Sequence, residues 1–264
     1  MKMLLAACAL LLPAAARAET PKTRLLLLSN TQNEGLGTLD HAMPAIKARL
    51  GGVDHVLLVL YASKDRAAGV EKFRKRFAVE GVAVDELTPD AKGLEALAKA
   101  RAVYVGGGNT YRLLKSLQDA GQLEPLRRRV REGVPYVGAS AGSVLAAPTI
   151  MTTNDMPIVS VAGFKALGLV PFQINVHFFD PIPGMPGETR EERLFEFLEE
   201  NDAPILAMRQ GGWLVVDGDA VALGGAGARL FRPGDKRFDK ARPDENKPRE
   251  FAPGASLGEA LRAR

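Results

Sequence analysis

The stretch YVGASAGSVL, residues 136–145, decides the fold that this sequence predicts. Tyr136 begins a short apolar run typical of a buried strand, and the chain then follows the pattern G-x-S-x-G through Gly138, Ser140 and Gly142. Between a strand and a helix, this pattern is typical of a nucleophile elbow, a sharp turn that lifts a serine above the carboxyl edge of a sheet. The N–H groups that begin the following helix can stabilise an oxyanion there. Tight turns of small residues are common in α/β proteins, so the motif by itself does not establish catalysis.

Strand-like and helix-like segments alternate around this turn. Short runs that are apolar throughout, as expected of strands buried on both faces, occur at 23–30, 55–62, 101–107 and 134–140. Helical patterns occur at 39–50, 66–81, 92–100, 109–121 and 187–201. After Pro204, the runs ILAM, WLVVDGD and AVALGG predict further strands. The alternation predicts an α/β fold in which helices cover both faces of a mainly parallel central sheet.

The ends of the chain differ from its middle. Residues 1–18 have the layout of a secretory signal peptide, with an early lysine, the apolar run 3–12 and a small-x-small cleavage site at 16–18. The apolar run is too short to cross a bilayer. We expect a single α/β domain at 19–233, followed by a charged, proline-rich and mostly irregular surface tail at 234–264. The protein is thus predicted to be secreted and periplasmic, with no membrane association after signal cleavage.

Composition excludes several classes of protein. Without the leader, the chain has 33 basic and 31 acidic residues. The resulting net charge of +2 is too small to indicate a nucleic-acid-binding protein. Cys8, the only cysteine, lies in the leader, so the mature chain can form neither disulfides nor a thiolate nucleophile. The three histidines, His41, His55 and His177, form no metal-binding motif. We therefore expect no metal and no other cofactor.

Two further features support a catalytic role for Ser140. Three successive glycines ending at Gly108 close a neighbouring predicted strand at the same sheet edge, and Asn109 follows them. Glycine runs cost conformational entropy, so they are expected where backbone must approach another group closely. A tight turn in which Asn109 caps the next helix would also explain them. The second feature is His177 in QINVHF, the only histidine after Ser140, although a packed core histidine is the alternative.

With these residues together, the chain resembles the dipeptidase E (α-aspartyl dipeptidase) family of serine peptidases. The resemblance covers about residues 23–233 and rests on six segments in the family's order: LLLLSNT, VGGGNTYRLL, GASAGS, TTNDMPIV, QINVHF and GETREERL. It implies a flavodoxin-like, three-layer α/β sandwich of the class I glutamine-amidotransferase type. Serine stands here where amidotransferases use cysteine, in agreement with the cysteine-free mature chain.

The resemblance also implies roles for the matched residues. Ser140 is then the nucleophile and His177 the general base and acid. The backbone N–H groups of Gly108 and Ala141 would form the oxyanion hole, which stabilises the charge that develops on the scissile carbonyl oxygen.

Two residues are expected to bind the substrate, Arg190 and Asn109. In family members the arginine of the GETR segment is thought to hold the aspartyl side chain, and a guanidinium suits a carboxylate because it can bind it with two parallel hydrogen bonds. From the residues alone, Arg190 could instead pair with Glu188 or Glu191 in the first turn of its helix.

The chain departs from the family at the residue that orients the histidine. Many members have a glutamate there, in a P-E-G-x-W segment, whereas this chain has Gln210 in RQGGW. A glutamine can accept the imidazole N–H but supplies no charge, and such a replacement in serine proteases costs about 10⁴ in turnover. Asp155, in TTND, is the preferred substitute, ahead of Asp180 and Glu188. Asp155 could instead be structural, holding the loop through an Asx turn.

The expected function is that of a secreted serine exopeptidase that hydrolyses dipeptides or short peptides with N-terminal aspartate through an acyl-enzyme. A small peptide substrate is the expected partner, and the sequence does not predict the oligomeric state. Two alternatives remain open. One is a cyanophycinase-like β-aspartyl peptidase, which would need an acidic pocket for an arginyl side chain. The other is a catalytically impaired protein that only binds aspartyl peptides, as Gln210 could suggest.

Overall fold

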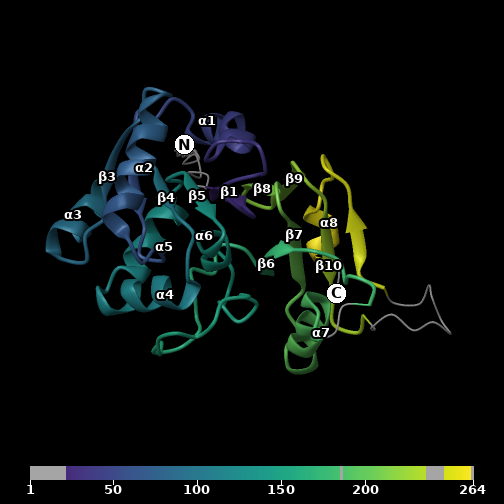
Figure 1. The fold of residues 1–264 in the computed structure, drawn as a ribbon. Coiled ribbons are helices and arrows are strands. Elements are labelled where there is room, and N and C mark those ends of the chain that lie inside the picture. Colours follow the sequence, from purple (N-terminus) through teal and green to yellow (C-terminus); the bar gives the residue numbers. More distant parts are fainter. Residues whose placement is uncertain (1–21, 185–186, 236–246, 263–264) are drawn as a thin grey trace, which may run out of the picture.

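Two β-sheets organise the chain in the computed structural model, which describes residues 22–184, 187–235 and 247–262 (Figure 1). The predicted signal peptide lies outside these residues. The strands are β1 (Arg24–Leu28), β2 (His55–Val59), β3 (Ala83–Glu86), β4 (Val103–Val105), β5 (Tyr136–Ala139), β6 (Gln173–Phe178), β7 (Ile205–Arg209), β8 (Trp213–Asp217), β9 (Ala220–Gly224), β10 (Ala228–Phe231) and β11 (Arg249–Phe251). The helices are the 3₁₀ turn η1 (Asp40–Ala42), α1 (Met43–Leu50), α2 (Arg66–Ala78), α3 (Ala91–Lys99), α4 (Thr110–Asp119), α5 (Leu123–Arg131), α6 (Ala141–Leu145), α7 (Arg190–Glu200) and α8 (Gly258–Arg262).

The first sheet has the order β3-β2-β4-β5-β1-β8-β9. Its five strands from β3 to β1 run parallel, and the hairpin β8–β9 adds two antiparallel strands at the β1 edge. The carboxyl ends of β4 and β5, which are neighbours, therefore meet at one edge. This brings the glycine run after β4 beside the elbow after β5, as the sequence predicts.

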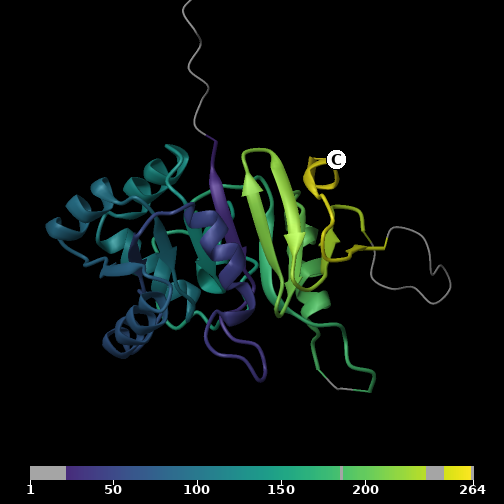
Figure 2. The same ribbon diagram turned by 90° about the horizontal axis from the view of Figure 1, so that it is seen from above.

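Successive leucines of β1 show how both faces of this sheet are covered. Leu25 and Leu27 belong to a core cluster that includes the apolar residues of α3, α4, α5 and α6. Leu26 and Leu28 point the other way and join α1 and α2 in a second cluster. Because successive side chains of a strand face opposite sides, an uninterrupted apolar run is what a strand between two helical layers requires. The arrangement of helices around the sheet is visible in Figure 2.

Elements α5 and β3 are absent from the sequence prediction. Helix α5 buries only Leu126 and Val130 of its nine residues, LEPLRRRVR, and β3 buries only Val84. Both are nonetheless regular because their few apolar side chains reach the layers already formed by stronger elements. The predicted fold class, a three-layer α/β sandwich with a mainly parallel central sheet, is confirmed.

A second sheet, with the order β11-β10-β7-β6, lies beside the first one (Figure 1). Strands β6 and β7 are parallel, while β10 and β11 are added antiparallel. Helix α7 covers this sheet through Leu194 and Phe195, which pack with Phe178 and Phe231. The sheet positions the strand that carries His177.

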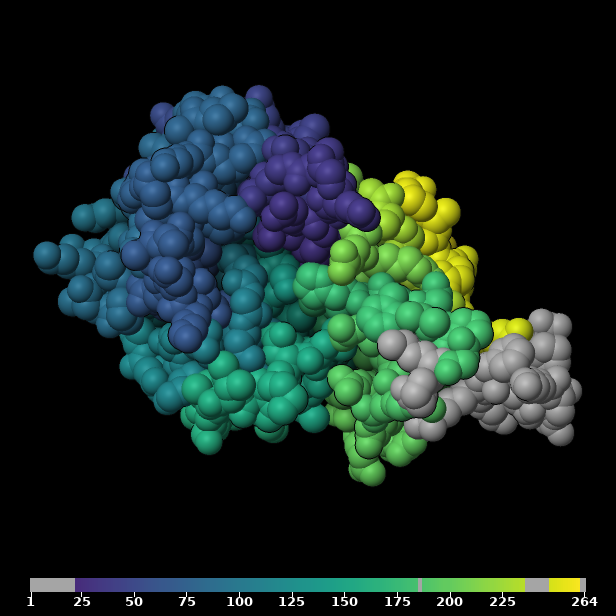
Figure 3. All heavy atoms as spheres, in the orientation of Figure 1, coloured from purple at the N-terminus to yellow at the C-terminus, as the bar shows by residue number. Residues whose placement is uncertain are grey.

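The C-terminal region differs from the irregular tail that the sequence suggests. Among the residues that the structure describes there, Arg249–Phe251 form β11 and Gly258–Arg262 form α8. Phe251 and Leu257 are buried, and the Leu257 N–H donates to the Val221 carbonyl at 2.8 Å. In Figure 3 this yellow segment lies against the strands of the β8–β9 hairpin. Isolated apolar residues in a charged stretch give no periodic signal, and only the sheet they join makes them regular.

No helix in the described part of the chain is long and apolar enough to cross a membrane.

Candidate active site

Ser140 lies at the turn between β5 and α6, with φ 52° and ψ −111°. A positive φ is unusual for a residue with a side chain and marks a strained turn of the kind found at functional sites. The turn depends on the glycines around it. A Cβ at Gly138 would lie 2.6 Å from the carbonyl oxygen of Gly142, and one at Gly142 would lie 2.1 Å from that of Val105. The motif therefore has a steric cause, since larger residues would push the elbow away from the sheet.

His177 meets Ser140 although 37 positions separate them in the chain. Its Nε2 lies 2.8 Å from the Ser140 hydroxyl oxygen. The pairing of β6 with β7 is irregular between Asn175 and Phe178, and His177 has φ 56° within this bulge. Bulges reorient side chains at strand ends. The backbone N–H of His177 donates to the Ser29 hydroxyl at 2.9 Å, so the first sheet fixes the bulge directly.

The two expected oxyanion donors flank the same point. Gly108 has φ 133°, and a Cβ there would lie 2.4 Å from the carbonyl oxygen of Ala62. Both features require glycine. Within the described residues, neither the Gly108 N–H nor the Ala141 N–H, which opens α6, has a hydrogen-bond acceptor. Both amides are therefore available to a substrate oxygen. A glycine loop and the start of a helix are typical places for the amides of an oxyanion hole.

Asn109 takes the helix-capping position. Its side-chain oxygen accepts from the Arg112 N–H at 3.0 Å, and its side-chain nitrogen donates to the Met156 carbonyl at 2.8 Å. Both ends of the amide are thus occupied by the protein, which favours the capping interpretation over direct contact with the substrate.

The TTND segment fastens the loop after α6 to neighbouring elements. One carboxylate oxygen of Asp155 accepts from the backbone N–H of Thr110 at 2.8 Å and from its hydroxyl at 2.5 Å. Asn154 donates to the Val176 carbonyl at 2.8 Å, next to His177. These contacts fit the structural interpretation of the segment. Asp155 also acts on His177 electrostatically, because its charge raises the pKa of the imidazole.

The position that orients His177 has no carboxylate in direct contact. Within the described part of the chain, no group makes a hydrogen bond with Nδ1 of His177. Gln210 lines the same pocket as Ser140 and His177. The other two candidates are engaged elsewhere, since Asp180 pairs with Arg209 and Arg229, and Glu188 pairs with Arg193. Gln210 thus shares a pocket with His177, on which the charge of Asp155 also acts. Asp180 and Glu188 are instead held in ion pairs with arginines.

The surroundings of His177 favour the neutral form of its imidazole, because together they lower its pKa. Burial lowers its pKa, the positive charge of Arg190 lowers it further, and Asp155 opposes both effects. A neutral imidazole can accept the proton of Ser140, which is what a general base must do.

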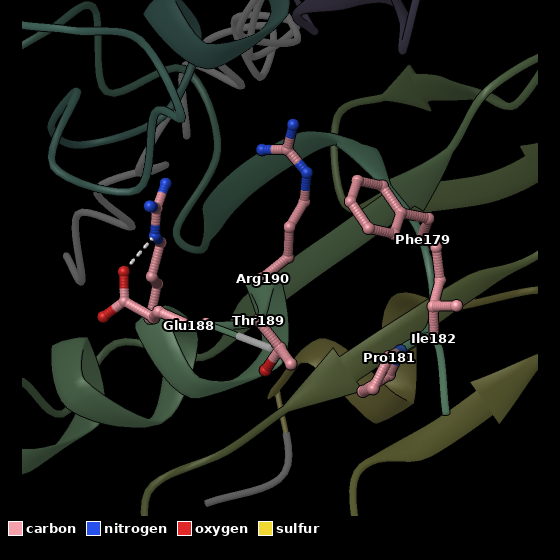
Figure 4. Close-up of a pocket in the computed structure, with 8 residues that line it drawn as sticks. Phe179, Pro181, Ile182, Glu188, Thr189 and Arg190 are labelled. Atoms are coloured by element: carbon pink, nitrogen blue, oxygen red, sulfur yellow. Dashed lines mark hydrogen bonds and ion pairs between the residues drawn. The ribbon is translucent and has the colours of Figure 1, made fainter. Parts of the chain in front are cut away.

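Arg190 projects from the start of α7 into a second pocket, of about 280 Å³, as Figure 4 shows. Its guanidinium lies 5.0 Å from the centre of the Phe179 ring. Neither predicted ion pair forms, because Glu188 pairs with Arg193 and Glu191 lies 3.4 Å from Arg229. Burial lowers the pKa of Arg190, as does the nearby Arg193, and its Nε is buried without a hydrogen-bond partner. Arg190 is therefore a cation available to an anionic ligand.

The pocket around Ser140 and His177 has a volume of about 300 Å³. Its further lining includes polar residues of the loop after β1, Asn30 to Gln32, and two residues of α2, Lys72 and Phe73. Among the described residues that line it, none is acidic. Sequence reasoning missed the contribution of α2, whose pattern indicates only a surface helix packed on the sheet.

Fold and site together define a class of protein, an α/β-sandwich hydrolase with a serine–histidine pair at a nucleophile elbow. Comparison with known proteins gives the family, because peptidase family S51 matches residues 25–224. A peptidase E of Streptomyces coelicolor is 47% identical over 243 residues, covering 91% of this chain and 96% of that protein. A probable alpha-aspartyl dipeptidase of Drosophila melanogaster is 42% identical over 214 residues, covering 79% of this chain and 89% of that protein. The chain belongs to peptidase family S51, and the assignment made from the sequence is confirmed.

Solved structures agree on the fold. A peptidase from an acI-B1 actinobacterium superimposes with a TM-score of 0.63 at 16% identity, covering 90% of this chain and 97% of that one. A putative peptidase E from Listeria monocytogenes gives a TM-score of 0.59 at 24% identity, covering 77% of this chain and 98% of that one. At these identities the likeness concerns the fold alone.

Proposed function

We propose that this S51 peptidase is a serine dipeptidase that hydrolyses short peptides with an N-terminal aspartate through an acyl-enzyme at Ser140. One observation carries the proposal: the Ser140 hydroxyl lies 2.8 Å from a half-buried imidazole whose pKa is lowered, beside two backbone amides that have no acceptor among the described residues. The names of the relatives, peptidase E and alpha-aspartyl dipeptidase, support the same activity.

The chemistry follows from these positions. His177 takes the proton of Ser140 as the serine oxygen attacks the carbonyl carbon of the aspartyl residue. The negative charge on the carbonyl oxygen is stabilised by the N–H groups of Gly108 and Ala141. His177 then protonates the leaving amine, and the bond to the second residue breaks. Water, activated by the same imidazole, hydrolyses the ester and restores Ser140.

Arg190 supports selectivity for aspartate. Its guanidinium has no acidic partner among the described residues, and its positive charge lowers the pKa of His177. Binding the aspartyl carboxylate would neutralise a partly buried cation at no cost to an existing ion pair. This separates the proposal from a cyanophycinase-like activity. An arginyl side chain would meet the cation of Arg190 in one pocket, where the carboxylate of Glu188 is already paired with Arg193. In the pocket of Ser140 it would meet no carboxylate among the described residues that line it.

The proposal includes a group that orients the imidazole of His177. When Ser140 donates to Nε2, the ring proton of His177 is on Nδ1 and needs an acceptor. The carbonyl oxygen of Gln210, which lines this pocket, is the group we propose for that role. Asp155 would then assist through its charge alone, since its carboxylate is held by Thr110.

Hydrolysis of Asp-Leu, Asn-Leu and Leu-Leu by the purified protein tests the activity. We expect cleavage of Asp-Leu well above the other two, and no cleavage of Asp-Leu by the Ser140→Ala variant. A fluorophosphonate probe should label Ser140 in the native protein and not in a His177→Ala variant. An unreactive Ser140 combined with tight binding of aspartyl peptides would instead identify a binding protein.

We also propose that the protein is exported. The support is the layout of residues 1–18, which lies outside the described structure. When the full chain is expressed in a Gram-negative bacterium, the periplasmic fraction should contain a protein whose N-terminus is Glu19. A cytoplasmic protein that retains Met1 would contradict this.

A further inference from the structure

Helix α2 brings one cation to the pocket of the serine–histidine pair. Lys72 lines this pocket together with Ser140, His177 and Gly108. It is exposed, and it precedes Phe73, which is buried and lines the same pocket. The pocket thus offers an ammonium group and an apolar surface next to the reacting atoms.

Lys72 differs from the other basic residues of α2. The helix contains five basic residues, and four of them form ion pairs. The four are Arg66, Arg74, Lys75 and Arg76. Lys72 has no acidic partner among the described residues, and no carboxylate of those residues lines its pocket. An unpaired cation beside a catalytic serine is suited to an anionic part of the substrate.

Helix α2 is held in place by ion pairs at both ends. Arg66 pairs with Glu86 at 2.6 Å near its start, and Arg76 lies 3.0 Å from both Asp40 and Glu80 near its end. The Asp65 side chain caps its first turn. Only the flexible lysine side chain must therefore be ordered when a ligand binds.

The two cations of the site serve different parts of a dipeptide. Arg190 lines the pocket of α7 and its charge acts on His177, whereas Lys72 lines the pocket that contains Ser140 and His177 themselves. A dipeptide with N-terminal aspartate has two carboxylates, one in the aspartyl side chain and one at its C-terminus. If Arg190 takes the first, the second extends with the leaving residue into the pocket of Lys72.

We propose that Lys72 binds the free C-terminal carboxylate of the leaving residue, with Phe73 contacting its side chain. The contact favours dipeptides, because a longer peptide has an uncharged amide at that position. This inference rests on the proposed hydrolysis of aspartyl dipeptides. The contact is remote from the bond that breaks, so it stabilises the bound substrate and the transition state equally and affects KM rather than kcat.

Comparison of Asp-Leu with Asp-leucinamide, in which a neutral amide replaces the carboxylate, tests the inference. For the native enzyme we expect kcat/KM to be about two- to fivefold higher for Asp-Leu, because a solvent-exposed ion pair contributes up to about 1 kcal/mol. The Lys72→Met variant should lose this preference through a higher KM for Asp-Leu, with unchanged constants for Asp-leucinamide. Lys72→Arg should retain it.

Lys75→Met is the matched control, because Lys75 lies on the same helix but pairs with Glu71 and is 77% exposed. It should behave as the native enzyme. Equal losses for both substrates in Lys72→Met, or a preference that survives in that variant, would overturn the role of Lys72 while leaving the dipeptidase activity intact. If the native enzyme cleaves neither substrate, the proposed function fails and this inference fails with it.

Discussion

Arg190 offers the sharpest test of how this site selects its substrate. Replacing it by methionine keeps the apolar stem of the side chain but removes the guanidinium, its charge and its contact with the Phe179 ring. A hydrogen-bonded contact between charged groups contributes about 1.5–3 kcal/mol. Since about 1.4 kcal/mol corresponds to a tenfold change, kcat/KM for Asp-Leu should fall about 10- to 150-fold in Arg190→Met.

Asn-Leu is the matched substrate, because it has nearly the same shape without the charge. Its hydrolysis should change little in Arg190→Met, so that the preference for aspartate over asparagine disappears. Arg193→Met is the matched variant, since Arg193 lies on the same helix but pairs with Glu188. It should keep the preference. Equal losses for Asp-Leu and Asn-Leu in Arg190→Met would refute the assignment of Arg190 to the aspartyl carboxylate.

The same variant has a second, independent readout. The charge of Arg190 lowers the pKa of His177. Removing that charge raises this pKa, and the imidazole must be neutral to act as a base. The acidic limb of kcat/KM for Asn-Leu should therefore move to higher pH in Arg190→Met. A limb that stays in place would contradict the electrostatic coupling of the two residues.

Three further variants test the rest of the site. Gly108→Ala places a Cβ 2.4 Å from the Ala62 carbonyl oxygen, at a backbone φ of 133°. Because this displaces one oxyanion donor, kcat should fall about 10²–10³-fold. A near-native kcat would exclude the Gly108 amide from the oxyanion hole. Asp155→Asn removes a charge that raises the pKa of His177, so the acidic limb of kcat/KM should move to lower pH, and an unchanged limb would show no coupling. Gln210→Glu should raise kcat and move that limb to higher pH, whereas unchanged kinetics would exclude Gln210 as the group that orients His177. Thermal unfolding of each variant controls for loss of the fold.

The local parts of the site are visible in the sequence because they require glycine at particular positions, and the glycine patterns can be read directly. The elbow at Ser140 needs small residues at fixed spacings, since a Cβ at Gly138 or Gly142 would meet backbone oxygens within 3 Å. Gly108 is visible for the same reason. Such steric requirements restrict these positions to glycine, so they can be recognised in the sequence. The strand–helix alternation around these glycines predicts the sheet edge where the two glycine-containing turns meet.

Other elements could not be predicted because their order depends on partners elsewhere. The residues of β11 and α8 lie in a charged stretch with isolated apolar side chains, and they become regular only against β10 and β9. The assignment of Arg190 was also open, since Glu188 and Glu191 are both within reach in sequence. The structure pairs these glutamates with Arg193 and Arg229 instead of Arg190, and Arg229 is 38 positions from Glu191.

The sequence by itself determined the class of fold and the family, and it predicted the serine of the elbow and the two backbone amides that we propose for the oxyanion hole. These predictions follow from the glycine patterns and from the alternation of apolar segments. Tertiary structure alone decided that the bulge in β6 turns His177 onto Ser140, that Asp155 is held by Thr110, and that Lys72 of α2 lines the same pocket. The physical reason is that these relations join different layers of the fold, where the distance between two side chains is set by packing and not by their spacing in the chain.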